Sequence, residues 1–276
     1  MWVVAWPRRL QSLGCDVILN DPPLQDEGRT EVAGIPLQSL DAIANCQIIS
    51  LHMPFTEQGA HPTHNLIDAA FLSHFLEGSL LINSCRGEVI EERALKAIVS
   101  SAQMHTVIDV WRGEPMVDRS LAQNVTLATP HIAGYSSRAK RNAVRQILPE
   151  LWRFAQAEGL IESIPEPGAT ADTAVGEDLV VDAKANCWQV VRQVLPLHSI
   201  SETFKQSLAH NQPENGFDAM RRQLQQRREF SEYRIAAENL SPKQANQFAA
   251  LGFQLCLLYT SPSPRDQRGS RMPSSA

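Results

Sequence analysis

The sequence has few cysteines, and their spacing argues against two kinds of small protein. Its five cysteines are scattered along 276 residues, and no two of them form a C-x-x-C pair. This spacing favours neither a zinc site nor a disulfide scaffold. We therefore expect reduced thiols, a cytoplasmic location and no metal.

Long apolar runs and a strong charge of either sign are also missing. No stretch approaches the roughly 20 apolar residues that a membrane span requires. The apolar run at the N-terminus is short and is followed, not preceded, by Arg8 and Arg9, unlike a secretory signal. A formal net charge of −5 gives no electrostatic reason to expect nucleic acid or an acidic membrane as a partner. With 43% hydrophobic residues, the chain can bury a substantial core.

Short apolar runs alternate with helical stretches from residue 8 to about 130, which predicts repeated βα units. The expected strands cover 15–20, 46–52, 78–84, 104–110 and 124–130. The expected helices between them cover 37–45, 68–75 and 91–101. Continuous runs of Val, Ile and Leu are typical of strands buried on both faces of a parallel sheet. We predict a doubly wound, Rossmann-type α/β sheet, in which ligands lie at the carboxyl ends of the strands.

A glycine-rich turn is missing where this fold would need one. Asp21 ends the first expected strand, where an acidic residue accepts hydrogen bonds from an adenosine ribose and favours NAD over NADP. An Asp before proline is also an ordinary turn former. The glycine-rich turn should stand about 20 residues upstream, but the chain begins inside the helix that should follow it, near 7–10. We therefore expect the first βα unit to be absent, NAD binding to be poor and turnover to be little or none.

Three charged side chains follow successive expected strands. Arg86 and Gly87 close the segment INSCRG: Arg86 can hold a substrate carboxylate through a bidentate pair, and Gly87 permits the backbone to bend. Glu114 lies in DVWRGEP, and His131 lies in TPHIAG. A lone histidine is more often structural, but a His–Glu pair at the cofactor edge can remove a proton from a secondary alcohol.

The motifs NxxRG, DVWxGEP and TPHIAG, in this order, resemble the signature of the D-isomer-specific 2-hydroxy-acid dehydrogenases. The resemblance covers roughly residues 8 to 255. It implies that Arg86 binds the carboxylate, that Glu114 orients and tunes His131, and that His131 is the proton donor and acceptor. The cofactor-contacting positions that it implies are Asp21, Met53, Asp109 and Gly134, and the substrate-contacting position is Tyr135. The implied reaction is NAD-dependent oxidation of a phosphorylated 2-hydroxy acid.

The remaining chain divides into three further parts after the partial NAD-binding domain at 1–135. A long helix, N-capped by Ser136 or Ser137, opens the connector at 136–165. Residues 166–256 are predicted to form a small α+β domain, in which 216–233 resemble the dimerisation domain found in one branch of the family, and this implies a homodimer. Its expected elements are helices near 179–195 and over 217–230, a strand at 233–235 and a helix before 251–255. The Ser-, Pro- and Arg-rich tail at 257–276 is expected to be disordered and non-native, with a native tail as the alternative.

Two questions stay open from the sequence alone. The cluster Arg221, Arg222, Arg227 and Arg228 is interpreted as a solvated or interface face, with a phosphate contact as the alternative. The chain could also act on glycerate, glyoxylate or 3-phosphoglycerate, or be a non-catalytic NAD-binding interaction protein.

Overall fold

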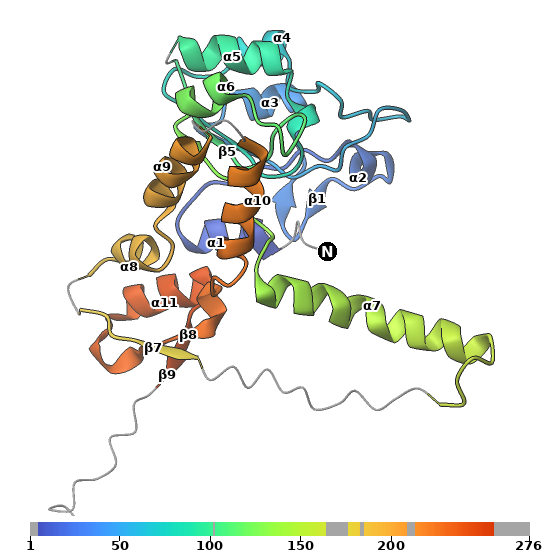
Figure 1. The fold of residues 1–276 in the computed structure, drawn as a ribbon, viewed down its shortest axis with the longest axis vertical. Helices are drawn as coiled ribbons and strands as arrows, with labels where there is room; N and C mark the ends of the chain where they lie inside the picture. The colour runs from blue at the N-terminus through green and yellow to red at the C-terminus, as the bar shows by residue number, and fades with distance from the viewer. Residues whose placement is uncertain (1–4, 102, 164–175, 183–184, 209–212, 257–276) are drawn as a thin grey trace, which may run out of the picture.

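The computed structural model describes residues 5–101, 103–163, 176–182, 185–208 and 213–256 (Figure 1). The expected tail at 257–276 lies outside these ranges, as do residues 164–175, where the expected connector meets the C-terminal part. Within the described chain, no helix is long and apolar enough to cross a bilayer.

The predicted parallel α/β sheet is confirmed. Its four strands run in the order β3-β4-β5-β6, and every neighbouring pair is parallel. The strands are β3 (Ile48–Leu51), β4 (Leu80–Asn83), β5 (His105–Ile108) and β6 (Leu127–Ala128). The helices among them are α3 (Leu40–Ala44), α4 (Ala69–Leu72), α5 (Glu92–Ser100) and α6 (Arg119–Asn124), with the 3-10 turn η1 (Gly87–Val89). The inward-facing apolar side chains of these strands, such as Leu81 and Ile108, are almost fully buried.

The strand expected over 15–20 does not form. This segment makes one isolated parallel bridge, from Leu19 to Leu37. A ladder needs a neighbouring strand along its length, and within the described residues Leu37 is the one bridge partner of this segment. Before it stands α1 (Ala5–Ser12), and after it come α2 (Pro22–Asp26) and the hairpin of β1 (Glu31–Val32) and β2 (Ile35–Pro36).

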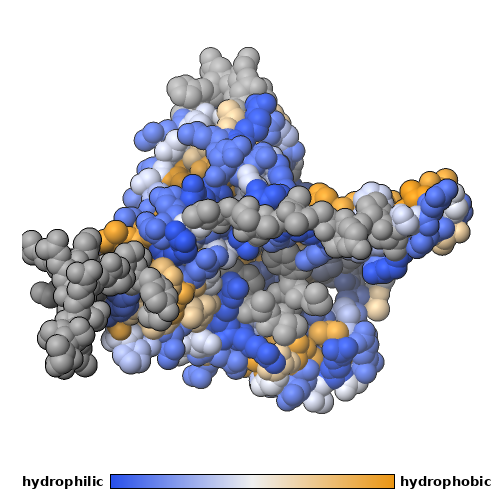
Figure 2. Space-filling model, turned by 90° about the horizontal axis from the view of Figure 1, so that it is seen from below, coloured by the Kyte–Doolittle hydropathy of each residue, from blue (hydrophilic) through white to orange (hydrophobic). Residues whose placement is uncertain are grey.

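The long helix is confirmed as α7 (Ser137–Ala157), and Ser136 is its N-cap. The Ser136 hydroxyl accepts a hydrogen bond from the Ala139 N–H at 2.9 Å, which satisfies one of the free donors of the first turn. In Figure 1 the helix projects away from the rest of the molecule, and it has no buried residue. Its exposed apolar side chains are Val144, Ile147, Leu151 and Phe154. Figure 2 shows hydrophobic surface along the projecting arm.

A second, smaller sheet lies in the C-terminal part, with all strands parallel and in the order β7-β8-β9. Its elements are β7 (Glu177–Leu179), α8 (Cys187–Val194), η2 (Phe230–Glu232), β8 (Tyr233–Ala236), η3 (Ala237–Asn239), α11 (Pro242–Leu251) and β9 (Gln254–Cys256). The helix expected near 179–195 is therefore wrong in its first half. It starts only at the capping box in which Asn186 and Gln189 exchange hydrogen bonds, while 177–179 pair as a strand.

Helices α9 (Leu197–Ser207) and α10 (Pro213–Leu224) join the core of the large sheet. Helix α9 also covers the open edge of β6: Ser201 Oγ accepts the Ala128 N–H at 2.9 Å, and Lys205 Nζ donates to the Val125 carbonyl at 2.8 Å. The helix expected over 217–230 is thus displaced, since α10 ends at Leu224 and Arg227 lies beyond it.

Candidate active site

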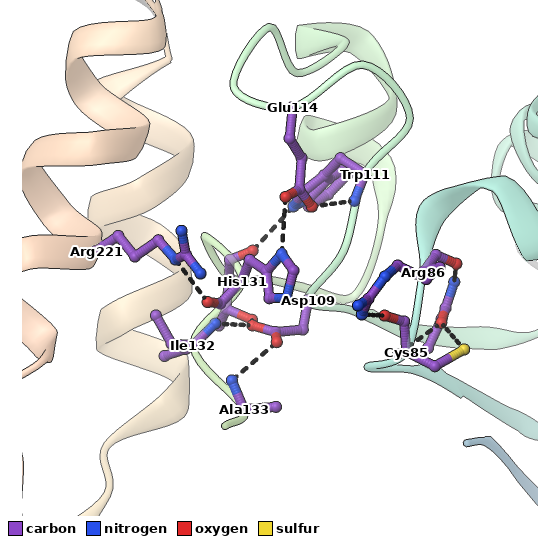
Figure 3. Close-up of polar contacts among 11 residues, drawn as sticks. Cys85, Arg86, Asp109, Trp111, Glu114, His131, Ile132, Ala133 and Arg221 are labelled. Carbon is purple, nitrogen blue, oxygen red and sulfur yellow. Dashed lines mark hydrogen bonds and ion pairs between the residues drawn. The ribbon is translucent and has the colours of Figure 1, made fainter. Parts of the chain in front are cut away.

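The parallel register brings the carboxyl ends of the strands to one edge. Leu51 pairs with Asn83, Asn83 with Ile108, and Ile108 with Ala128. The loops that carry Arg86, Glu114 and His131 leave the sheet just beyond these residues, so the register gathers them at this edge (Figure 3).

His131 and Glu114 form a hydrogen-bonded pair. Nδ1 of His131 lies 2.7 Å from Oε2 of Glu114, and both side chains are about three-quarters buried. The other carboxylate oxygen accepts the backbone N–H of Trp111 at 2.7 Å. Because the carboxylate holds Nδ1, the imidazole presents Nε2 as its free proton acceptor.

Asp109 shapes the turn that presents His131. Its Oδ1 accepts hydrogen bonds from Thr129 Oγ1 at 2.6 Å and from the Ile132 N–H at 2.7 Å. Its Oδ2 accepts the Ala133 N–H at 2.9 Å. His131 itself has φ of 54°, a left-handed conformation that few side chains adopt without support. Asp109 therefore holds this turn, and the cofactor contact that the family resemblance implies for it stays a prediction.

Arg86 stands in the turn after β4. The Asn83 side chain donates to the Arg86 carbonyl at 2.9 Å, and the exposed Arg86 side chain folds back on the Cys85 carbonyl at 2.6 Å. Gly87 is required for close approach and not for a bend: a Cβ there would lie 2.3 Å from the carbonyl carbon of Trp111. The Arg86 turn and the Glu114 loop thus touch backbone to backbone.

The other predicted cofactor positions lie around this edge. The Asp21 carboxylate caps α2 by accepting the Leu24 N–H at 3.2 Å through Oδ1. Met53 is half-buried, with its sulfur 3.9 Å from Cys85 Sγ. Gly134 is exposed.

Tyr135, the predicted substrate contact, lies between two cations. Lys140 Nζ is 3.9 Å and Arg221 Cζ is 4.2 Å from the centre of its ring. The hydrogen bond from Lys140, reinforced by the charges of Lys140 and Arg221, lowers the pKa of the Tyr135 hydroxyl.

Two arginines contact the His131 turn in a way that the sequence did not predict. Arg221 Nε donates to the His131 carbonyl at 3.0 Å, and Arg227 Nη2 donates to the Ile132 carbonyl at 2.6 Å and to that of Ala133 at 3.3 Å. These contacts differ from a fully solvated face, and the prediction that the cluster lies at an interface stays a prediction. The first contact joins residues 90 positions apart, so no local pattern could have predicted it.

A parallel α/β sheet with a His–Glu pair and an arginine at its carboxyl edge is the architecture of a nicotinamide-dependent dehydrogenase. Residues 5–133 match the D-isomer specific 2-hydroxyacid dehydrogenase NAD-binding domain. An erythronate-4-phosphate dehydrogenase of Shewanella sp. (strain DB6705) is 32% identical over 254 residues, which cover 88% of this chain and 90% of that protein. The chain therefore belongs to the D-isomer-specific 2-hydroxyacid dehydrogenase family.

Other relatives are longer than the chain. The erythronate-4-phosphate dehydrogenase of Teredinibacter turnerae is 35% identical over 252 residues, covering 90% of this chain and 64% of that enzyme. The corresponding enzyme of Shewanella loihica is 36% identical, covering 88% of this chain and 63% of that enzyme. The chain thus spans less than two thirds of these two relatives. Among solved structures, Rhodotorula graminis D-mandelate dehydrogenase is 30% identical, with a TM-score of 0.35 over 38% of this chain and 30% of that one.

The cofactor is NAD, and its ribose end fits the residues present. Asp21 Oδ2 accepts no hydrogen bond within the described chain, so it can receive the ribose hydroxyls. Between residue 1 and Asp21 the sequence has one glycine, Gly14. The described residues thus leave one Asp21 carboxylate oxygen open to a ribose, and they contain no glycine-rich turn ahead of Asp21.

Proposed function

We propose that the protein oxidises 4-phospho-D-erythronate to 2-oxo-3-hydroxy-4-phosphobutanoate with NAD, a step of pyridoxal phosphate biosynthesis. The His131–Glu114 pair at the carboxyl edge of the sheet carries this proposal. The names of the relatives from Teredinibacter and Shewanella support the choice of substrate.

Each site residue has a distinct task in this reaction. Nε2 of His131 takes the proton of the C2 hydroxyl, and the Glu114 carboxylate stabilises the imidazolium that forms. The Arg86 guanidinium turns from the Cys85 carbonyl to hold the substrate carboxylate and to polarise the developing carbonyl group. Bound NAD supplies the hydride acceptor.

We further propose a cytoplasmic homodimer formed through the C-terminal part of the chain. The resemblance of residues 216–233 to a dimerisation domain supports this proposal. We also expect the 276-residue chain alone to turn over little or nothing, because its described residues offer the pyrophosphate no glycine-rich turn.

The test is NADH formation from 4-phospho-D-erythronate by the chain and by a chimera that adds the segments of the T. turnerae relative outside the matched region. In the chimera, His131→Ala should lower kcat by about two to four orders of magnitude, as loss of a general base does. His198→Ala, at an exposed position on α9, is the matched control.

The outcomes separate the levels of the proposal. A His131→Ala variant with unchanged kcat would refute the assigned acid–base role. Activity on glycerate, glyoxylate or 3-phosphoglycerate instead would leave the reaction class in place and remove the named substrate. Rapid turnover by the 276-residue chain alone would contradict the expectation that this chain turns over little or nothing.

A further inference from the structure

Helix α10 reaches the candidate site from the far end of the chain. Arg221 lies in its last turn and Arg227 just beyond its end, and both donate to backbone carbonyls of residues 131–133. Figure 3 shows Arg221 on one side of His131 and Arg86 on the other.

These contacts complete the support of a strained turn. On its N–H side the turn is held by Asp109, whose carbonyl accepts the His131 N–H at 2.7 Å and whose carboxylate accepts those of Ile132 and Ala133. On its carbonyl side it is held by Arg221 and Arg227. A left-handed non-glycine residue costs roughly 1–3 kcal/mol and persists only where its surroundings hold it. Here both sides of the turn are held by charged partners.

The same helix is packed against the loop of Glu114. The rings of Phe217 on α10 and Phe204 on α9 lie 5.9 Å apart, and Phe204 lies 6.1 Å from Trp111. Trp111 donates its backbone N–H to Glu114 and its indole N–H to the Thr129 carbonyl at 2.9 Å. The two halves of the acid–base pair and helix α10 are therefore one packed unit.

The two guanidinium groups make hydrogen bonds to this turn, and the carboxylates of Glu229 and Asp109 act on Arg227 through their charge alone. No ion pair within the described chain involves Arg221 or Arg227. Arg227 is half-buried, and burial lowers its pKa. Burying a guanidinium is unfavourable unless it finds acceptors, and Nη2 of Arg227 donates to two carbonyls of this turn.

We propose that Arg221 and Arg227 are positioning residues of the acid–base pair, which hold the turn that presents the His131 imidazole to Glu114 and to the substrate. Helix α10 is then part of the catalytic site in addition to any role in dimerisation. This inference rests on the proposed acid–base role of His131.

The first test needs no turnover. Long-range 1H–15N NMR of the chain labelled with 15N-histidine reports which ring nitrogen of His131 carries the proton, with His131→Gln used for assignment. In the wild type the Glu114 contact should select the Nδ1–H form. In the Arg221→Gln/Arg227→Gln double variant this preference should be lost, whereas Arg222→Gln, at the exposed neighbouring position, should retain it. An unchanged Nδ1–H form in a folded double variant would overturn the proposal.

The second test uses the chimera and separates positioning from phosphate binding. Arg221→Gln should lower kcat about 10- to 100-fold, the loss expected from a small misplacement of a catalytic group, with the KM for NAD unchanged. The loss should be equal for 4-phospho-D-erythronate and D-erythronate. Arg221→Lys, which keeps one donor, should lose less and guards against misfolding. A loss confined to the KM for the phosphorylated substrate would overturn the proposal. If neither substrate is turned over, the proposed function fails while the NMR test still decides this one.

Discussion

At the scale of single residues, the ionisation of Tyr135 reports the positive charges that lie near His131. Lys140 donates a hydrogen bond to its hydroxyl, and with Arg221 it favours the phenolate, so the Tyr135 pKa lies below its ordinary value. We predict that Lys140→Gln shifts the ionisation of Tyr135 to higher pH, because the largest stabilising partner of the phenolate is then gone. Ultraviolet absorbance of tyrosinate during a pH titration measures this shift, with Tyr135→Phe assigning the signal.

Tyr233 provides an internal reference for that titration. Burial, its largest influence, raises the pKa of Tyr233, so it should ionise after Tyr135 in both proteins. Identical Tyr135 titrations with and without Lys140 would show that the ring and the ammonium do not interact in solution.

The sequence could predict the meeting of His131 and Glu114 but not that of His131 and Arg221. The first two follow parallel strands that end at one edge of the sheet, so the fold class alone brings them together. Arg221 lies 90 positions from His131 in the sequence. It reaches the turn because helices α9 and α10 pack on the core of the large sheet. Such a contact depends on tertiary packing, which has no local signature. The catalytic roles of these residues remain proposals.

At the scale of elements, the turn of Arg86 and the loop of Glu114 are joined where Gly87 meets Trp111. A Cβ at Gly87 would overlap backbone atoms, which cannot rotate away as a side chain can. We predict that Gly87→Ala lowers the free energy of unfolding by about 1–3 kcal/mol, as overpacking does, and lowers kcat by displacing both elements. Thermal unfolding and NADH formation by the chimera measure the two effects.

Gly134→Ala is the matched control for stability, because a Cβ there meets no atom within 4 Å and the backbone is not left-handed. A Gly87→Ala protein as stable as Gly134→Ala would mean that the two loops do not approach each other so closely.

Among the elements, sequence pattern predicted those with a strong local signal. The N-cap serine predicts the start of helix α7, and the apolar runs predict the strands β3 to β6. Residues 15–20 have an equally good strand pattern, but a strand is stable only beside a partner, and Leu37 alone pairs there. The pattern of a segment cannot show whether that partner exists.

At the scale of the molecule, the described chain has two hydrophobic cores that do not follow the order of the sequence. The large core contains the four-stranded sheet together with Phe204 and Phe217 of α9 and α10. The small core gathers Cys187, Val190, Ile235, Phe248 and Phe253 around the second sheet. The predicted division at residues 136 and 166 stays a prediction. Helices α9 and α10, which it assigns to the C-terminal domain, nevertheless pack with the catalytic sheet.

This arrangement predicts that the two cores open separately. Phe204 and Phe248 are each fully buried, one in each core, so replacing either by alanine should cost about 3–5 kcal/mol. Hydrogen exchange measured by mass spectrometry should then show faster exchange in β6, α10 and the His131 turn for Phe204→Ala. For Phe248→Ala the faster exchange should be confined to β8, β9 and α11. Each variant is the control of the other. Equal loss of protection in β4 and β5 in both variants would show that the cores unfold as one unit. Unchanged hydrogen exchange in the His131 turn of Phe204→Ala would show that α9 and α10 do not support the catalytic pair.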